Sequence, residues 1–141
     1  RKLENYQFTI IGLSAEIKEY VNRNKPKNLV LHDYIENNNL RNFIASSKVY
    51  CQFSLSEGLP NALCEAMLCE CIPVGSNVNG IPDGIGETGL ILMHNDVDEA
   101  AELVKKALHM DSIAGKKARE HIIKNFSHEK RENSIFKLLE I

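Results

Sequence analysis

The sequence lacks an excess of charge of either sign. Its 17 Lys and Arg residues and 19 Asp and Glu residues leave a net charge of −2 over 141 residues. Lys and Arg form no dense patch, so we expect no nucleic-acid partner. The sequence also lacks any apolar run near the roughly 18–20 residues that a bilayer-spanning helix needs, and no signal peptide opens it. We therefore expect no membrane span in this segment.

The spacings typical of disulfide frameworks and metal sites are also missing. The four cysteines are Cys51, Cys64, Cys69 and Cys71. The closest pair has one residue between its members, one short of C-x-x-C, and the five histidines show no ligand spacing. Buried free thiols are the favoured interpretation, with a disulfide or a zinc site as the alternative. A reducing compartment fits best.

What the sequence does contain is an alternation of short β-rich runs and helical segments. We predict strands at 6–12, 28–33, 48–54, 71–76 and 90–93. We predict helices at 15–24, 37–47, from Pro60 to 69, 97–109, 112–125 and 127–141, with Ser14, Asp96 and Ser127 as caps, and a loop at 77–89. The alternation predicts the α/β class, a doubly wound, Rossmann-like parallel sheet with helices on both faces. The length predicts a single domain over 1–141.

The segment 56–67, SEGLPNALCEAM, carries the strongest functional signal. It follows the run 48–54, and in such folds ligands bind beyond the carboxyl ends of the strands. Pro60 suits a first helical turn, where its missing N–H costs no hydrogen bond. The N–H groups of residues 61–63 then lack intrahelical acceptors, and the helix dipole favours an anion there. Because Gly58 allows close approach, the segment predicts a phosphate-binding helix start.

Glu65 is the one charged residue in the apolar run 62–69, ALCEAMLC. A helix that is apolar all round is buried on several sides, so we expect this carboxylate to be enclosed. An enclosed charge without a partner is costly. Glu65 therefore needs a basic side chain, a loop that it caps, or a ligand. A vicinal diol, such as that of a ribose, is a natural bidentate partner for a carboxylate.

Residues 84–89, GIGETG, match the pattern G-x-G-x-x-G. A dinucleotide-binding fingerprint follows a strand and opens a helix. This one follows a Pro-containing loop and leads into the predicted strand at 90–93. We interpret its glycines as turn residues, and Asp83 and Glu87 as solvated loop carboxylates.

The E-x7-E spacing of Glu57 and Glu65 around Gly-Leu-Pro-Asn resembles a glycosyltransferase motif. Other segments agree in order along the chain: IPVGS (72–76), NGIPDGI (79–85), GLIL (89–92) and KNFS (124–127). The sequence is similar to the C-terminal, donor-binding half of a GT-B glycosyltransferase, and most similar to the retaining glycosyltransferases group 1, family 4.

This resemblance implies roles for individual residues. Glu57 is expected to contact the transferred sugar at the reacting centre, and Glu65 to accept hydrogen bonds from the nucleotide ribose. The backbone that contacts the sugar and the diphosphate is implied to be that of Gly58, Leu59, Pro60, Asn61, Ala62 and Leu63. The nucleobase is expected to lie near Asp33, Tyr34 and Ile35.

The implied reaction is transfer of a hexosyl group from a nucleotide diphospho-sugar with retention, in polysaccharide or glycolipid biosynthesis. The resemblance implies no metal and no other cofactor. The acceptor-binding N-terminal domain, the first strand of the donor domain and the family's basic diphosphate-binding residues would precede residue 1. We therefore expect a fragment whose partners are the donor and its own N-terminal domain. By itself it is expected to bind the donor weakly and to transfer nothing. The expected location is the cytoplasm, with peripheral association at the inner face of the membrane left open.

Two positions depart from the family pattern. Glu70 stands where the family commonly has Gly at the end of the E-x7-E helix, and Asn79 where it often has Gly. If position 70 needs a left-handed backbone, glutamate costs about 1 kcal/mol there. Two other functions stay open: a GT-B nucleotide-sugar epimerase, and a non-enzymatic nucleotide-sugar-binding or scaffold module.

Overall fold

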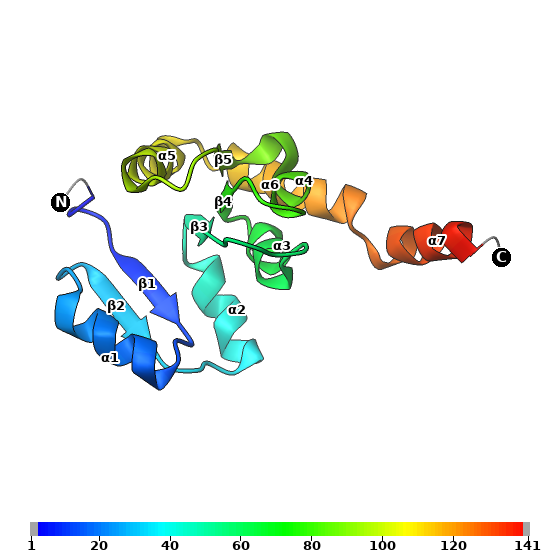
Figure 1. The fold of residues 1–141 in the computed structure, drawn as a ribbon. Coiled ribbons are helices and arrows are strands. Elements are labelled where there is room, and N and C mark those ends of the chain that lie inside the picture. Colours follow the sequence, from blue (N-terminus) through cyan, green and yellow to red (C-terminus); the bar gives the residue numbers. More distant parts are fainter. Residues whose placement is uncertain (1–2, 140–141) are drawn as a thin grey trace. The chain divides into compact units, whose positions relative to one another are not determined.

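The computed structural model describes residues 3–139, which form two compact units that meet in the chain between Phe43 and Ile44. Each unit has its own parallel sheet (Figure 1). That the whole chain forms one domain stays a prediction.

The first unit is a strand–helix–strand arrangement. Strands β1 (Phe8–Ile11) and β2 (Leu29–His32) pair in parallel, and α1 (Ala15–Asn24) connects them. Lys18 of α1 forms an ion pair with Asp33, the residue after β2. This ion pair ties the end of the strand to the helix.

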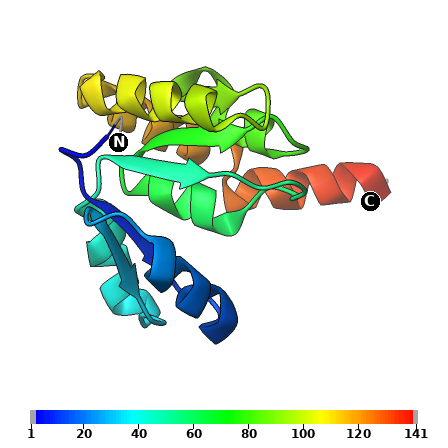
Figure 2. The same cartoon turned by 60° about the vertical axis from the view of Figure 1, so that its left-hand side comes forward.

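The second unit has a three-stranded sheet with helices on both faces. Its strands, parallel and in this order, are β3 (Val49–Gln52), β4 (Ile72–Ser76) and β5 (Leu90–Leu92). Its helices are α3 (Asn61–Leu68), α4 (Ile81–Ile85), α5 (Val97–His109), α6 (Ile113–Asn125) and α7 (His128–Leu139), and α2 (Asn37–Ala45) leads into it. Helix α5 covers one face of the sheet and α3 the other (Figure 2). The predicted α/β class is confirmed, with the strands divided between two parallel sheets.

One buried hydrophobic cluster of the second unit lies where α3, α4 and α6 meet the sheet. Its buried side chains are Leu63, Met67, Ile81, Ile85, Ala118 and Ile122. Helix α4 sits directly on β4, because a Cβ at Gly75 would lie 2.5 Å from Ile81 Cγ2. Among the cysteines, Cys71 is buried as predicted, whereas Cys51, for which burial was predicted, is exposed.

Helix α3 ends in a Schellman motif. The N–H of Cys71 donates to the carbonyl of Ala66 at 3.0 Å, and the N–H of Glu70 donates to the carbonyl of Met67 at 2.9 Å. Glu70 has a φ of 65°, and Asn79, the second departure from the family pattern, has a φ of 45°. The left-handed backbone suspected at position 70 is therefore present.

The prediction of a loop over 77–89 is wrong in part, because this segment contains α4 and a 3₁₀ turn over Gly86–Thr88. The glycines and the proline that suggest a turn also permit one short helix, since Pro82 stands in its first turn. Residues 84–89 start inside α4 and lead into β5, so they lack the strand-to-helix context of a dinucleotide fingerprint. Gly84 lies in α4, which corrects its interpretation as a turn residue.

The predicted caps have different outcomes. Asp96 caps α5, its Oδ1 accepting from the Glu99 N–H at 2.7 Å, and Ser127 Oγ accepts from the Lys130 N–H at 3.3 Å. Ser14 precedes α1 but its side chain makes no capping hydrogen bond, so that prediction is wrong. Within residues 3–139, none of the helices combines the length and the apolar character needed to cross a bilayer.

Candidate functional site

The start of α3 lies just beyond the carboxyl end of β3, where the sequence places it. The chain leaves β3 after Gln52, and Pro60 precedes the first helical residue with φ −67° and ψ 126°. The first helical hydrogen bond runs from the Cys64 N–H to the Pro60 carbonyl, at 3.3 Å. The N–H groups of residues 61–63 have no acceptor among the residues that the structure describes. These free donors at the helix start agree with the sequence analysis, and the binding of an anion there stays a prediction.

The segment between β3 and α3 is held from the side by the chain around α4. A Cβ at Gly80 would lie 2.8 Å from the carbonyl oxygen of Gly58 and 3.1 Å from the nitrogen of Leu59, so only glycine permits this approach. A Cβ at Gly84 would lie 2.4 Å from Leu59 Cδ1. The Leu59 side chain thus packs over Gly84, and both contacts fix the backbone just before the helix start.

The helix that carries Glu65 is amphipathic, which corrects the prediction of a helix buried on several sides. Leu63, Ala66 and Met67 are fully buried, whereas Glu65 is exposed. Residues four apart share a helix face, so Glu65 lies on the same face as Asn61, one turn further along the helix. Asn61 is exposed as well. The sequence does not reveal the exposed face of α3, because two residues on it, Ala62 and Leu68, are apolar and yet exposed.

The charges of Glu57 and Glu65 both act on the Tyr50 phenol. Burial is the main cause that raises the pKa of the Tyr50 phenol, and the charges of Cys51, Glu65, Cys71 and Glu57 raise it further. Glu57 is half-buried, and neither glutamate makes a hydrogen bond or an ion pair with another residue of the described range. Two carboxylates without a partner in the described chain thus accompany the free amides of α3, one ahead of the helix start and one on the exposed face of the helix. The arrangement can accept hydrogen bonds from hydroxyl groups while an anion binds at the helix start.

The residues predicted to contact the nucleobase belong to the first unit. Asp33 is already paired with Lys18, Tyr34 is 78% exposed, and Ile35 is half-buried. Their role stays a prediction.

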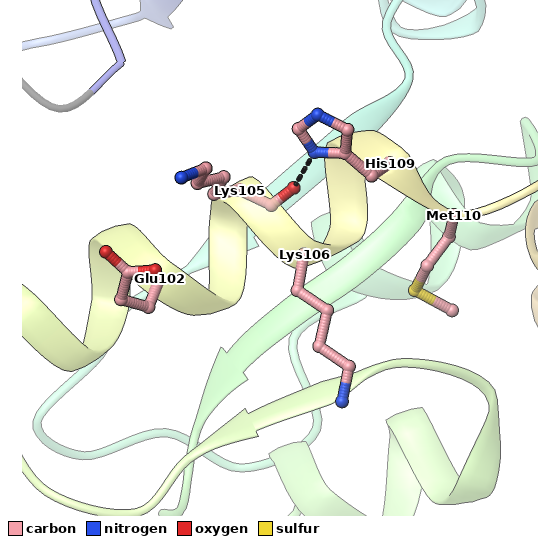
Figure 3. A pocket seen from close by; sticks show the side chains of 5 residues that line it. All are labelled: Glu102, Lys105, Lys106, His109 and Met110. Atoms are coloured by element: carbon pink, nitrogen blue, oxygen red, sulfur yellow. Dashed lines mark hydrogen bonds between the residues drawn. The ribbon is translucent and has the colours of Figure 1, made fainter.

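Hollows open on the second unit both at the end of its sheet and on α5. A cavity of about 110 Å³ lies at the carboxyl ends of β3, β4 and β5, lined by Phe53, Ser54, Leu55, Ser76, Asn77, Val78, Leu92, Met93, His94 and Asn95. A hollow of about 520 Å³ on α5 is lined by Glu102, Lys105, Lys106, His109 and Met110 (Figure 3). The hollow on α5 contains none of the predicted site residues. The cavity at the strand ends adjoins the segment of Glu57. It was not predicted from the sequence, although the predicted strand ends at 54 and 76 belong to its lining.

Comparisons with known proteins agree along most of the chain. The sequence model of the family described as glycosyl transferases group 1 matches residues 1–129. O-antigen chain mannosyltransferase B of Escherichia coli is 32% identical over 79 residues, which are 56% of this chain and 21% of that protein. N-acetyl-alpha-D-glucosaminyl L-malate synthase of Bacillus anthracis is 32% identical in an alignment 115 residues long, which covers 74% of this chain and 30% of that protein. The chain thus spans less than a third of either relative.

Solved structures share the fold. Sucrose-phosphate synthase from Thermosynechococcus elongatus superposes with a TM-score of 0.78 at 21% sequence identity, covering 94% of this chain and 38% of that one.

Proposed function

Because the chain belongs to the glycosyl transferases group 1 family, we propose that it binds a nucleotide diphospho-sugar as the donor half of a GT-B glycosyltransferase. The observation that carries the proposal is the helix start of α3. In the sequence its free N–H groups at residues 61–63 lie between Glu57 and Glu65, two carboxylates without a protein partner in the described chain. Amides for a diphosphate and carboxylates for hydroxyl groups are the complement of a nucleotide sugar.

In this proposal the transfer is of the retaining, family 4 type. Glu57 contacts the transferred sugar and supports the charge at the reacting centre. Glu65, on the exposed face of α3, accepts hydrogen bonds from the ribose diol. The backbone of residues 58–63 holds the diphosphate, so the leaving group is stabilised by amide dipoles and no metal is invoked. Asp33, Tyr34 and Ile35 contact the base.

The acceptor is held by a second, N-terminal half, as in the family that the sequence resembles. One relative is named as a mannosyltransferase and the other as an N-acetyl-alpha-D-glucosaminyl L-malate synthase. Hexosyl transfer is therefore the proposed reaction class. Residues 1–141 by themselves are expected to bind the donor weakly and to transfer nothing.

A titration of the chain with UDP, GDP and ADP, and with UDP-glucose, GDP-mannose and ADP-glucose, tests the proposal. We expect NMR shifts at the amides of residues 61–63 with one base preferred. Glu65→Ala should weaken that binding about tenfold or more, because a hydrogen-bonded charge is lost. Glu120→Ala, at an exposed glutamate of α6, is the matched control and should change nothing. The absence of shifts at these amides with every nucleotide at millimolar concentration would contradict the proposal.

A further inference from the structure

A line of polar side chains runs along β3 toward the segment that carries Glu57. We name it the strand-end chain; its members are Tyr50, Gln52 and Ser54 along β3 and beyond it, and Ser76 at the end of β4. Residues two apart on a strand point to the same face, so the first three members can bond in sequence. The proposed roles of Glu57, Glu65 and the helix amides use none of these four residues.

Each member of the strand-end chain is linked to the next. The Tyr50 hydroxyl donates to Gln52 Oε1 at 3.1 Å, and Gln52 Nε2 donates to Ser54 Oγ at 2.9 Å. The side chain of Gln52 is thereby fixed at both ends, as its amide has one partner for its oxygen and one for its nitrogen.

Ser76 clasps the backbone of Ser54. Its Oγ accepts from the Ser54 N–H at 3.1 Å and donates to the Ser54 carbonyl at 2.7 Å. The pairing of β3 with β4 ends where Gln52 lies opposite Gly75. The Ser76 hydroxyl therefore replaces the backbone hydrogen bonds that a further residue pair of the two strands would make. It orders the polypeptide as far as Ser54, two residues beyond the end of β3.

The segment with Glu57 thus lies between two fixed points. The clasp holds it at Ser54, and the approach of Gly80 to Gly58 holds it at the other end. Glu57 stands between them, one residue before Gly58 and three after Ser54.

We propose that the strand-end chain is a positioning device that holds Glu57 where the transferred sugar meets it. The strand-end chain acts on Glu57 through the backbone. The Ser76 clasp binds main-chain groups of Ser54, and the side-chain amide of Gln52 already has a partner for its oxygen and for its nitrogen. None of its members is proposed as catalytic. The inference rests on the proposed function only for the identity of the ligand that Glu57 meets.

Amide hydrogen exchange of the ligand-free chain tests the positioning directly. In Ser76→Ala we expect the amide of Ser54 to exchange at least about fivefold faster, relative to those of α6, because the Ser54 N–H loses its acceptor and its carbonyl loses its donor. Ser76→Thr keeps the hydroxyl and should restore the slow exchange. Ser56→Ala is the matched control, since Ser56 is an exposed serine of the same segment without a hydrogen bond to the rest of the described chain. Unchanged exchange in Ser76→Ala would overturn the proposal.

A second readout separates positioning from general stability. For whichever base binds, affinities for the free diphosphate and for its sugar form are compared, using UDP with UDP-glucose, GDP with GDP-mannose, or ADP with ADP-glucose. Ser76→Ala should reduce the difference between the two affinities as Glu57→Gln does, and leave the free-diphosphate affinity within about twofold. An equal loss for both ligands would refute a role at the sugar. Faster exchange in Ser76→Ala, with no nucleotide bound even by the unaltered chain, would support the clasp and count against the proposed function alone.

Discussion

Glu70 occupies a backbone conformation that suits glycine. Its φ is 65°, and its carbonyl lies against α6, where a Cβ at Gly115 would come within 2.0 Å of that oxygen. The Glu70 carboxylate lies 3.8 Å from Arg119, and both side chains are almost half exposed. An ion pair of this kind contributes little, so the side chain does not offset the backbone strain.

Replacing Glu70 by glycine should therefore stabilise the protein. We expect Glu70→Gly to raise the free energy of unfolding by about 1 kcal/mol, because the left-handed strain is relieved. Urea denaturation followed by circular dichroism measures the change. Glu70→Ala is the control, since it removes the same carboxylate and keeps the Cβ. A stability gain of the same size in Glu70→Ala would show that the carboxylate, rather than the backbone, is responsible.

At the scale of the element, the segment 57–60 leads directly into helix α3, and Gly80 lies against it at Gly58. The two glycines that face each other there have different surroundings. A Cβ at Gly58 would meet nothing within 4 Å, whereas a Cβ at Gly80 would meet the backbone of Gly58 and Leu59. Gly80 is thus required by packing, and the open space at Gly58 is available to a ligand.

A pair of alanine substitutions separates these two requirements. Gly58→Ala should leave the free energy of unfolding within about 0.5 kcal/mol but weaken binding of the preferred nucleoside diphosphate. Gly80→Ala should cost about 1–3 kcal/mol, because backbone atoms must move to admit the methyl group. Urea denaturation and the nucleotide titration provide the two measurements. Equal stability losses in the two variants would contradict the assigned packing, and unchanged affinity in Gly58→Ala would mean that no ligand approaches this residue.

At the scale of the whole molecule, buried acids of high pKa limit stability at alkaline pH. Burial raises the pKa of the Cys71 thiol from 9.0 to about 12, and its Sγ lies 3.3 Å from the carbonyl oxygens of Ile44 and Ser47. Burial also raises the pKa values of Tyr50 and Cys64. The unfolded chain loses these protons first as the pH rises.

Stability should therefore fall once the pH exceeds the unfolded pKa of the thiol, near 9.0. Between that value and the folded pKa, the folded state holds one more proton, so the free energy of unfolding decreases by up to about 1.4 kcal/mol per pH unit for this thiol. Urea midpoints between pH 8 and pH 10.5 measure the slope. Cys71→Ser should give a shallower slope, since serine can donate to the same carbonyls and does not titrate. Identical slopes would exclude Cys71 as the cause.

The sequence by itself determined the features that depend on neighbouring residues. The alternation of strands and helices, the Asp96 cap and the free amides after Pro60 follow from residues within one turn or one strand. Local hydrogen bonding and side-chain periodicity are sufficient to specify them. The E-x7-E spacing likewise placed Glu57 before the helix and Glu65 inside it.

Tertiary structure alone decided which face of α3 is solvated, how the strands divide between two sheets, and how the segment of Glu57 is held. Glu65 is exposed because Leu63, Ala66 and Met67 take the core side of the helix, and apolar Ala62 and Leu68 conceal this in the sequence. The Ser54–Ser76 clasp joins residues 22 apart, and the approach of Gly80 to Gly58 has the same separation. Such contacts depend on the packing of distant segments, and no local pattern encodes them.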